Sequence, residues 1–465
     1  MSFTDLLFLA GFFPLSFLIY LPFSKSVKVS NVVLFVLSLI FYGFGGWKNL
    51  MVLLFMILFV YAAGQVMNNM KTKAKRRMNL IATTTVLIIV FLVYRYLHGL
   101  SESLQAMGLG FVRLFPYEMP VGLSFYMFSL LSYYFDLYQK RVEVQKNPIS
   151  LGLYCAFFGR VNMGPIGHYE SFAPQLNHHP ISFKRINKGA ALFVQGLVMK
   201  VLLADNFALI FGQLSGDASW LGNLLFGFSY FFQLYFDFAG YSRMARGIGS
   251  LFGFEIPENF HLPYTAISVQ EFWRRWHISL TGWFRRYVYI PLGGNRVSHS
   301  RWIINILVVW LLTGFWHGGS WTFLFWGLWQ AALILLEHQI GQPRLNGLPK
   351  FLRHALVVLT QLIGWTLFFS PTLLSAFETI GRYFGLGTSG LASAMSLTVC
   401  AGSLWLFIIG IFISAGAGKL IAQIIRKLSP SSYKWMSLAA YGICFMVCLS
   451  FLVASTSQSF LYAAF

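Results

Sequence analysis

The sequence predicts an all-α protein that crosses a membrane many times. Of its 465 residues, 57% are hydrophobic and only 10% are charged, whereas soluble domains carry about 25% charged residues. Apolar runs recur along the chain at about 20 residues, the length that spans roughly 30 Å of hydrocarbon. We therefore expect about eleven to twelve transmembrane helices, with re-entrant and interfacial helices, around a central tunnel. A transmembrane β-barrel would instead show alternating segments of about ten residues.

Basic clusters between the apolar runs set the expected order of the spans. The stretch "KTKAKRR", residues 71–77, holds five basic residues, and the positive-inside rule places it in the cytoplasm. Counting from this loop in both directions gives twelve crossings, with both chain ends outside. The first run lacks a basic start and a cleavage site, so we expect a retained span rather than a signal peptide. The expected spans are 3–22, 30–44, 49–67, 78–97, 118–138, 190–212, 220–240, 302–317, 320–339, 351–371, 397–417 and 435–455, with an outer connector at 98–117.

Two stretches interrupt this pattern. Residues 150–176 contain Arg160 and several Gly and Pro, so we expect a re-entrant or interfacial segment, because irregular backbone is tolerated at membrane depth only beside protein or water. Residues 241–301 are the least hydrophobic and carry eight arginines, which is typical of Trp-rich, amphipathic helices at the cytoplasmic interface. The sequence contains no internal repeat and no soluble stretch of domain size, so one membrane-embedded domain, 1–465, is expected.

The charge balance points to the membrane and not to nucleic acid. The net charge is +20, from 34 Lys+Arg against 14 Asp+Glu, but the basic residues stand mainly in short connectors between spans. Membrane topology and an anionic leaflet account for that placement, so no nucleic-acid partner is expected. The four cysteines lie in apolar runs without a His or Cys cluster, so they are expected to be small buried hydrophobes, and no metal site is expected.

One histidine stands inside an apolar run. In "TGFWHGGSW", His317 follows Trp316 and precedes Gly318 and Gly319, two residues that let another backbone or a ligand approach closely. Ionisable side chains within membrane helices are candidates for function because their burial is costly. The alternative is a hydrogen-bonded structural histidine near the outer interface.

Two further polar groups accompany it. In "VQEFWRRWHISLTGWFRRYVYIPLGGNR", residues 269–296, helical spacing would place Trp273, Trp276 and His277 on one face. An interfacial helix with Trp anchors and snorkelling arginines is the alternative. In "FFQLYFDFAGYS", Asp237 lies deep in an aromatic helix. Because an unpaired buried charge is so unfavourable, we expect it to be protonated or to pair with an Arg or His of residues 269–296.

These motifs together resemble the membrane-bound O-acyltransferase family. The stretches are "QLYFDFAGYSRMARGIGSLFGFEIPENFHLPY", "VQEFWRRWHISLTGWFRRYVYIPLGGNR" and "GFWHGGSWTFLFWGLW", and the resemblance is strongest over residues 120–340. The ending "TSQSFLYAAF" fits more loosely. "WRRWHISL" and "YIPLGGNR" are similar to the branch that contains the membrane subunit of alginate O-acetyltransferase and related polysaccharide acetylation proteins. That branch usually has Asp where this chain has Arg243 and Arg286.

The resemblance implies a reaction, a location and partners. It implies transfer of an acyl group, most simply acetyl, from a cytoplasmic thioester across the bacterial inner membrane to a hydroxyl of an extracytoplasmic polysaccharide or partner protein. The donor would be acetyl-coenzyme A or an acyl carrier protein, used as substrate, and no bound cofactor or metal is implied. The acceptor polymer stays open among alginate, cellulose, peptidoglycan, other exopolysaccharides and teichoic acid. Alternatives are D-alanyl transfer to teichoic acid, a transporter, and a docking subunit without chemistry of its own.

The resemblance also assigns residues by position. It places the membrane histidine at His317 and the second histidine at His277, with His317 expected to act as general base because imidazole titrates near working pH. His277 and Asp237 are expected to orient the donor or the base, and the arginines of residues 274–296 to form a positive cytoplasmic mouth that attracts phosphates. The predicted substrate-binding residues are Asp237, Asn259, Trp273, Arg274, Trp276, Arg285, Asn295 and Trp316.

Overall fold

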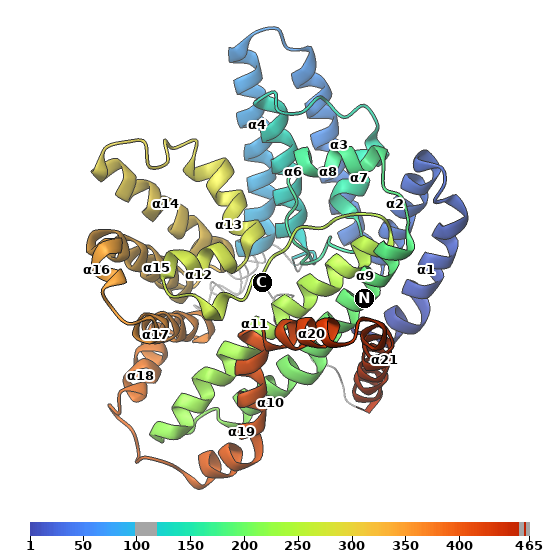
Figure 1. Cartoon of the computed structure of the whole chain (residues 1–465). Coiled ribbons are helices and arrows are strands. Elements are labelled where there is room, and N and C mark those ends of the chain that lie inside the picture. The colour runs from blue at the N-terminus through green and yellow to red at the C-terminus, as the bar shows by residue number, and fades with distance from the viewer. Residues whose placement is uncertain (98–118, 455–459, 462–465) are drawn as a thin grey trace, which may run out of the picture. The chain divides into compact units, whose positions relative to one another are not determined.

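The computed structural model describes residues 1–97, 119–454 and 460–461, and every regular element within these ranges is helical (Figure 1). The connector expected at 98–117 lies outside the described residues. The α-helices are α1 (Phe13–Tyr20), α2 (Val27–Gly43), α3 (Trp47–Asn69), α4 (Lys73–Leu92), α6 (Leu123–Tyr138), α7 (Pro148–Ala156), α8 (Tyr169–Asn177), α9 (Phe183–Val198), α10 (Asp205–Gln213), α11 (Trp220–Leu251), α12 (Val269–Arg275), α13 (Ile278–Phe284), α14 (His299–His317), α15 (Trp321–Ile340), α16 (Gln342–Asn346), α17 (Lys350–Phe369), α18 (Leu373–Tyr383), α19 (Ala394–Ser414), α20 (Ala417–Leu428) and α21 (Pro430–Ala454). Short π or 3-10 turns are η1 (Leu7–Phe12), η2 (Leu21–Phe23), η3 (Val93–Leu97), η4 (Met199–Ala204), η5 (Pro263–Thr265) and η6 (Arg285–Tyr289).

The all-α, polytopic character predicted from the sequence is confirmed. Within the described ranges, six helices are long and apolar enough to cross a membrane, namely Trp47–Asn69, Lys73–Leu97, Phe183–Gln213, Lys350–Phe369, Ala394–Ser414 and Ser432–Ala454. Shorter apolar helices cover Leu7–Phe23 and Val27–Gly43. The sequence predicted about twelve crossings, which is twice the number of helices that meet both criteria. Most of the other expected spans are also helices, but they are shorter, as α6 is with 16 residues, or richer in polar and Trp side chains, as α14 and α15 are.

The chain forms two compact units, which α9 and α11 both enter. Unit 1 comprises residues 1–193 and 244–257, and unit 2 comprises residues 194–243 and 258–465. The continuous helical stretches that contain α9 and α11, Phe183–Gln213 and Trp220–Leu251, are both longer than the expected spans. The helical stretch expected at 190–212 begins at Phe183, and the one expected at 220–240 continues to Leu251. The region expected to be interfacial therefore starts as a continuation of α11.

Unit 1 confirms that residues 150–176 are broken. The helices α7 and α8 are separated by irregular backbone from 157 to 168. Arg160 lies in this break and is only 4% exposed. Its guanidinium stacks over the rings of Tyr154 and Phe172 at 4.5 and 4.7 Å and donates a hydrogen bond to the Tyr154 carbonyl. Backbone and ring electrons thus stabilise this buried charge.

A buried histidine holds other parts of unit 1 together. The hydroxyl of Tyr20 in α1 lies 3.1 Å from Nδ1 of His179, and Oδ1 of Asn31 in α2 lies 2.8 Å from its Nε2. Its ring also stacks on Phe254, with centroids 4.6 Å apart. Burial lowers the pKa of His179 to about 4, so the ring is neutral at physiological pH and serves as a structural hydrogen-bonding partner.

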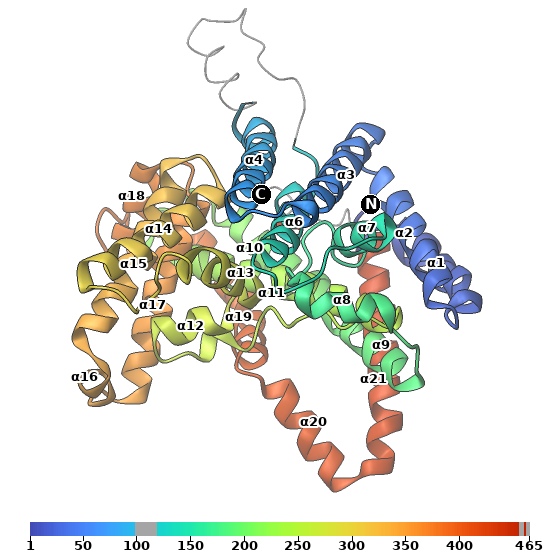
Figure 2. The ribbon, with the colours of Figure 1, turned by 90° about the horizontal axis from the view of Figure 1, so that it is seen from above.

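In unit 2, α14 and α15 form a tightly packed antiparallel hairpin, and α17 packs against α15 (Figures 1 and 2). Two glycines make the close approach possible. A Cβ on Gly314 would collide with the carbonyl of Phe323, and one on Gly327 with the carbonyl of Trp310. Because His317 ends α14, this glycine contact fixes where the histidine stands.

Candidate active site

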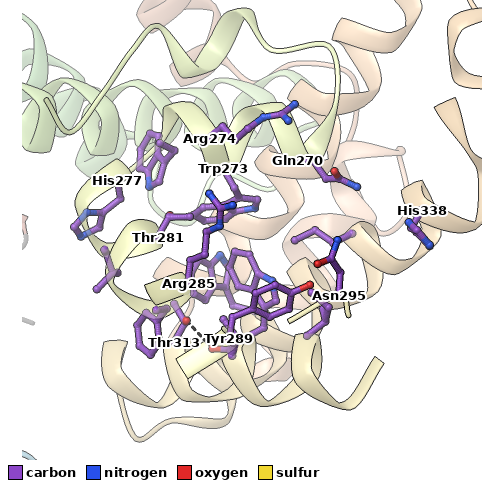
Figure 3. Close-up of a pocket in the computed structure, with 18 of the residues that line it drawn as sticks. Gln270, Trp273, Arg274, His277, Thr281, Arg285, Tyr289, Asn295, Thr313 and His338 are labelled. Atoms are coloured by element: carbon purple, nitrogen blue, oxygen red, sulfur yellow. Dashed lines mark hydrogen bonds between the residues drawn. The ribbon is translucent and has the colours of Figure 1, made fainter. Parts of the chain in front are cut away.

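Unit 2 contains a cavity of about 390 Å³ whose lining includes both predicted histidines. Figure 3 labels His277 among the lining residues. His277 lies between α12 and α13, and His317 is the last residue of α14. In the view of Figure 3, Gln270, Asn295 and His338 lie towards one side and His277 towards the other. The lining residues are Gln270, Trp273, Arg274, Trp276, His277, Leu280, Thr281, Phe284, Arg285, Tyr289, Asn295, Trp302, Ile306, Val309, Trp310, Thr313, His317, Trp326, Ile334 and His338.

Helix α12 is held in position by hydrogen bonds to α15 and by its own N-terminal cap. The side chain of Ser268 caps the first turn by accepting a hydrogen bond from the N–H of Glu271 at 3.1 Å. The carboxylate of Glu337 in α15 accepts a second hydrogen bond from this turn, from the N–H of Val269 at 2.6 Å. It lies at the positive end of the helix dipole, where negative charge is stabilising. The indole of Trp273 then donates to Oε1 of Gln330 in α15 at 3.0 Å.

The sequence-based placement of Trp273, Trp276 and His277 on one helical face was wrong. Helix α12 ends at Arg275, Trp276 is extended, and His277 has a left-handed backbone with φ of 44°. All three side chains nevertheless line the same cavity. The sharp turn at His277 brings the three side chains together, and a shared helical face does not.

A neighbouring non-helical segment stabilises this break. The carbonyl of Asn259 accepts the N–H of Ile278 at 3.0 Å, and the N–H of His261 donates to the carbonyl of Arg275 at 2.9 Å. Backbone groups that a continuous helix would have satisfied thus find partners outside it. The sequence gives no local signal for such a partner, which explains why periodicity misled the prediction.

The side chain of Asn259 fixes the tautomer of His277. Its Oδ1 accepts the N–H and the hydroxyl of Ser279 at 3.2 and 2.9 Å, and it lies 3.1 Å from Nδ1 of His277. A backbone N–H can only donate, so the Asn259 atom that contacts the N–H of Ser279 is the amide oxygen. The same oxygen contacts Nδ1 of His277, so Nδ1 must be the protonated nitrogen. In the neutral ring Nε2 therefore carries the lone pair. Burial lowers the pKa of His277 to about 3, which keeps the ring neutral.

Aromatic rings surround His317. The ring centroids of Trp316, Trp326 and Phe368 lie 4.5, 5.1 and 5.0 Å from its imidazole, each in an edge-to-face arrangement. Only 3% of its surface is exposed, yet the residue lines the cavity. Trp316 does not line the cavity, but its ring centroid lies 6.4 Å from that of His277 and therefore close to both histidines.

The exposed part of the lining is basic and polar. Arg274, Arg285 and Asn295, three of the residues predicted to bind substrate, all line the cavity and are exposed. The lining also contains residues that were not predicted from the sequence, among them Gln270, Thr281, Tyr289, Thr313 and His338. His338 adjoins Glu337 near the end of an apolar helix, so the rule that flags ionisable residues in such helices could have found it.

Asp237 lies elsewhere in unit 2 and does not line the cavity. We had expected it to be protonated or to pair with an Arg or His of residues 269–296. Its partner is instead Lys200. The Lys200 ammonium lies 2.7 Å from Oδ1 of Asp237 and 2.8 Å from Oδ1 of Asp205. The N–H of Leu461 donates to the other oxygen of Asp237 at 2.9 Å. Lys200 was not predicted, although it stands within an otherwise apolar expected span and the rule that flags ionisable residues there could have found it.

Comparison with protein families identifies the chain. The model of the membrane-bound O-acyltransferase family matches residues 34–369. The chain belongs to this family. It is therefore an O-acyltransferase, and the resemblance noted in the sequence motifs is confirmed.

Individual relatives of this O-acyltransferase act on bacterial polymers, according to their names. It is 34% identical to the probable alginate O-acetylase AlgI of Pseudomonas aeruginosa over 406 residues, which cover 83% of this chain and 76% of the relative. It is 31% identical to the peptidoglycan O-acetyltransferase of Helicobacter pylori over 420 residues, 82% of this chain and 79% of the relative. It is also 27% identical to the teichoic acid D-alanyltransferase of Bacillus subtilis, over 46% of this chain and 58% of the relative.

The cavity of this membrane-bound O-acyltransferase has the groups that acyl transfer needs. Imidazoles can take and return the proton of an attacking hydroxyl. Aromatic walls can exclude water, which would compete with an acceptor hydroxyl for an activated carbonyl. Exposed guanidinium groups can bind phosphates.

Proposed function

We propose that this enzyme moves an acetyl group from a thioester donor to a hydroxyl of an extracytoplasmic polysaccharide, directly or through a partner protein, in the inner membrane of a bacterium. The observation that carries this proposal is that His277 and His317 line one cavity with the exposed Arg274 and Arg285. The names of the relatives, alginate O-acetylase and peptidoglycan O-acetyltransferase, support acetyl as the group and polysaccharide as the acceptor.

His317 acts as the general base in this proposal. Its imidazole takes the proton of the acceptor hydroxyl as the oxygen attacks the thioester carbonyl. The carbon–sulfur bond then breaks, and the proton passes to the departing thiolate. The pKa of a base should lie near the working pH for this transfer. His277, with a pKa near 3, is too weak a base for the role.

His277 instead orients the donor. Its lone pair at Nε2 accepts hydrogen bonds, because Asn259 holds the proton on Nδ1. Coenzyme A and acyl carrier proteins present their thioester on a pantetheine arm that contains amide N–H groups. One of these N–H groups can donate to Nε2 and so fix the carbonyl carbon beside the base.

An acetyl-transfer assay tests the function directly. The purified full-length protein in lipid nanodiscs would be incubated with acetyl-labelled acetyl-coenzyme A and with oligosaccharides of alginate, cellulose and peptidoglycan, with and without a periplasmic extract. The expected result is an O-acetyl ester on one acceptor, identified by mass spectrometry. The partial match to the D-alanyltransferase favours the teichoic-acid alternative. That alternative would be established if the protein transferred a D-alanyl group from its carrier protein but no acetyl group from acetyl-coenzyme A or from an acetylated carrier protein.

Replacing Arg285 by Glu should weaken donor binding without slowing chemistry. Arg285 lines the cavity and is exposed, so reversing its charge is expected to raise KM for acetyl-coenzyme A by about tenfold at low salt, while kcat changes little. The effect should disappear with acetyl-pantetheine, which lacks the phosphates. The matched control is Arg426→Glu, the same charge change at an exposed arginine in α20 that does not line the cavity. An equal KM in the two variants would contradict the phosphate-binding role.

Replacing Asn259 by Ala should reduce kcat/KM by about 10- to 100-fold, as the loss of a partner that orients a functional histidine does. The variant Asn259→Asp keeps the acceptor oxygen and should recover most of this activity at high pH. Its carboxylate would also raise the pKa of His277 by favouring the imidazolium. Protonated Nε2 no longer accepts a hydrogen bond, so activity should fall, as pH decreases, at a higher pH than in the native enzyme. Identical pH profiles would leave Asn259 a purely structural residue.

A further inference from the structure

A second cavity in unit 2, of about 700 Å³, is apolar along most of its length. It runs between α11, α17 and α19, and its wall contains a cluster of Phe and Leu side chains. We refer to it as the apolar groove. Its lining residues are Leu221, Leu224, Leu225, Phe228, Phe231, Phe232, Tyr264, Thr265, His354, Val358, Cys400, Leu404, Phe407, Ile411, Ser414 and Ala415.

The groove opens towards the hydrocarbon of the bilayer. Helices α17 and α19 both qualify as membrane spans. Leu404 and Ile411, seven residues apart on one face of α19, line the groove and are 53% and 56% exposed. Large apolar side chains exposed on a spanning helix face lipid. The acyl chains of the bilayer therefore lie beside the mouth of the groove.

Polar and basic groups collect at one end of the groove. Lys350, His354 and Val358 follow one another at intervals of four residues on α17, so they share a face, and the last two line the groove. The hydroxyl of Thr265, a third lining residue, accepts a hydrogen bond from the guanidinium of Arg275 at 2.6 Å. This end therefore has cationic groups next to an apolar channel.

The same end belongs to the basic side of the membrane. Two successive spans joined by a short non-spanning helix must run antiparallel, so the start of α17 and the end of α19 reach the same face. Residues 344–354 and 419–434, which flank these two ends, contain seven Lys and Arg and no Asp or Glu. The positive-inside rule makes this the cytoplasmic face, whose leaflet carries anionic lipid.

The groove is long enough to hold one acyl chain. Cys400 and Ser414 both line it and lie fourteen residues apart on α19, which corresponds to about 21 Å at the helical rise. One leaflet contributes roughly half of the 30 Å hydrocarbon core. A single chain of one leaflet can therefore lie along the groove with its headgroup at the basic end.

We propose that the apolar groove binds an anionic phospholipid of the cytoplasmic leaflet, with one acyl chain along α19 and the phosphate beside Lys350 and His354. This site is separate from the cavity that holds the two histidines and does not depend on the proposed reaction. The wall between them is thin, because Tyr264 lines the groove, Trp276 lines the other cavity, and their rings stack with centroids 5.9 Å apart.

Native mass spectrometry of the full-length protein tests the binding. The protein would be released from nanodiscs that contain equal amounts of phosphatidylglycerol and phosphatidylethanolamine. We expect one retained phosphatidylglycerol per chain, favoured by at least about fivefold because each basic group beside a membrane surface contributes about that factor. Lys350→Glu should abolish this preference. Equal retention of the two lipids by the native protein would overturn the headgroup assignment.

Two groove-filling variants test the position of the chain. Val358→Trp and Leu404→Trp should each remove the retained lipid, whereas Ile408→Trp should not, since Ile408 is 44% exposed on the same helix but does not line the groove. A phosphatidylglycerol with a photoreactive acyl chain gives an answer on the native protein. Cross-links should map to the lining residues of α11, α17 and α19. Equal loss in all three variants, or cross-links spread over α3 and α21, would overturn the proposal.

Discussion

Replacing His317 by Gln is expected to lower kcat for acyl transfer by about 10²- to 10⁴-fold, which is the usual contribution of general acid–base catalysis. Glutamine nearly matches histidine in size, so the aromatic surroundings at Trp326 and Phe368 should persist. It cannot titrate near neutral pH. Steady-state kinetics in nanodiscs should therefore show a large fall in kcat with little change in KM for the donor.

The matched control is His299→Gln, which makes the same substitution in α14. His299 is exposed and does not line the cavity, so this variant should retain native kinetics. Thermal unfolding of both variants checks that the fold is intact. A His317→Gln enzyme that is fully folded and keeps a tenth or more of the native kcat would refute the role of His317 as general base.

Replacing Lys200 by Met is expected to destabilise the protein by about 3–5 kcal/mol, because a buried ion pair that loses one partner leaves an uncompensated charge. Lys200 is 2% exposed and contacts the carboxylates of Asp237 and Asp205. Asp237→Asn should cost less, since Lys200 keeps Asp205 and the amide oxygen can still accept the N–H of Leu461. The measurement is the unfolding midpoint in detergent as a function of temperature or denaturant.

Lys73→Met provides the control for this comparison, since Lys73 is exposed at the start of α4. Its midpoint should stay close to that of the native protein. If Lys200→Met unfolds at the same midpoint as Lys73→Met, the buried cluster contributes nothing to stability. The order of the three midpoints therefore tests the ion pair without reference to enzyme activity.

The fold class could be predicted because hydropathy reports on the solvent around each helix. Apolar runs identified α3, α4 and α19 within a few residues. The helix ends were less predictable, since α11 continues past Asp237 through Arg243 to Leu251. Tertiary packing extends such a helix beyond its apolar part, and a window of hydropathy does not detect that contact.

The sequence indicated which two histidines stand together better than it indicated the geometry around them. His277 and His317 lie on one cavity, as the motifs suggested. The partners of buried polar groups were not predictable, since Lys200 is 37 residues from Asp237 and Asn259 reaches His277 across a helix break. Such pairings follow from how segments meet in space, and neither spacing nor composition reports them.

The amide of Asn259 has a consequence for which molecules the cavity admits. Because its oxygen keeps the imidazole of His277 in a single protonation form, the donor-orienting role that we propose for His277 requires a hydrogen-bond donor on the incoming molecule. The lone pairs of an incoming carbonyl, ether or phosphate oxygen would be repelled by the lone pair on Nε2 of His277. A thioester whose arm had N-methylated amides would be rejected for the same reason, although its shape and charge were otherwise suitable. The enzyme would thus select acyl donors that carry a hydrogen-bond donating group, before the carbon–sulfur bond breaks.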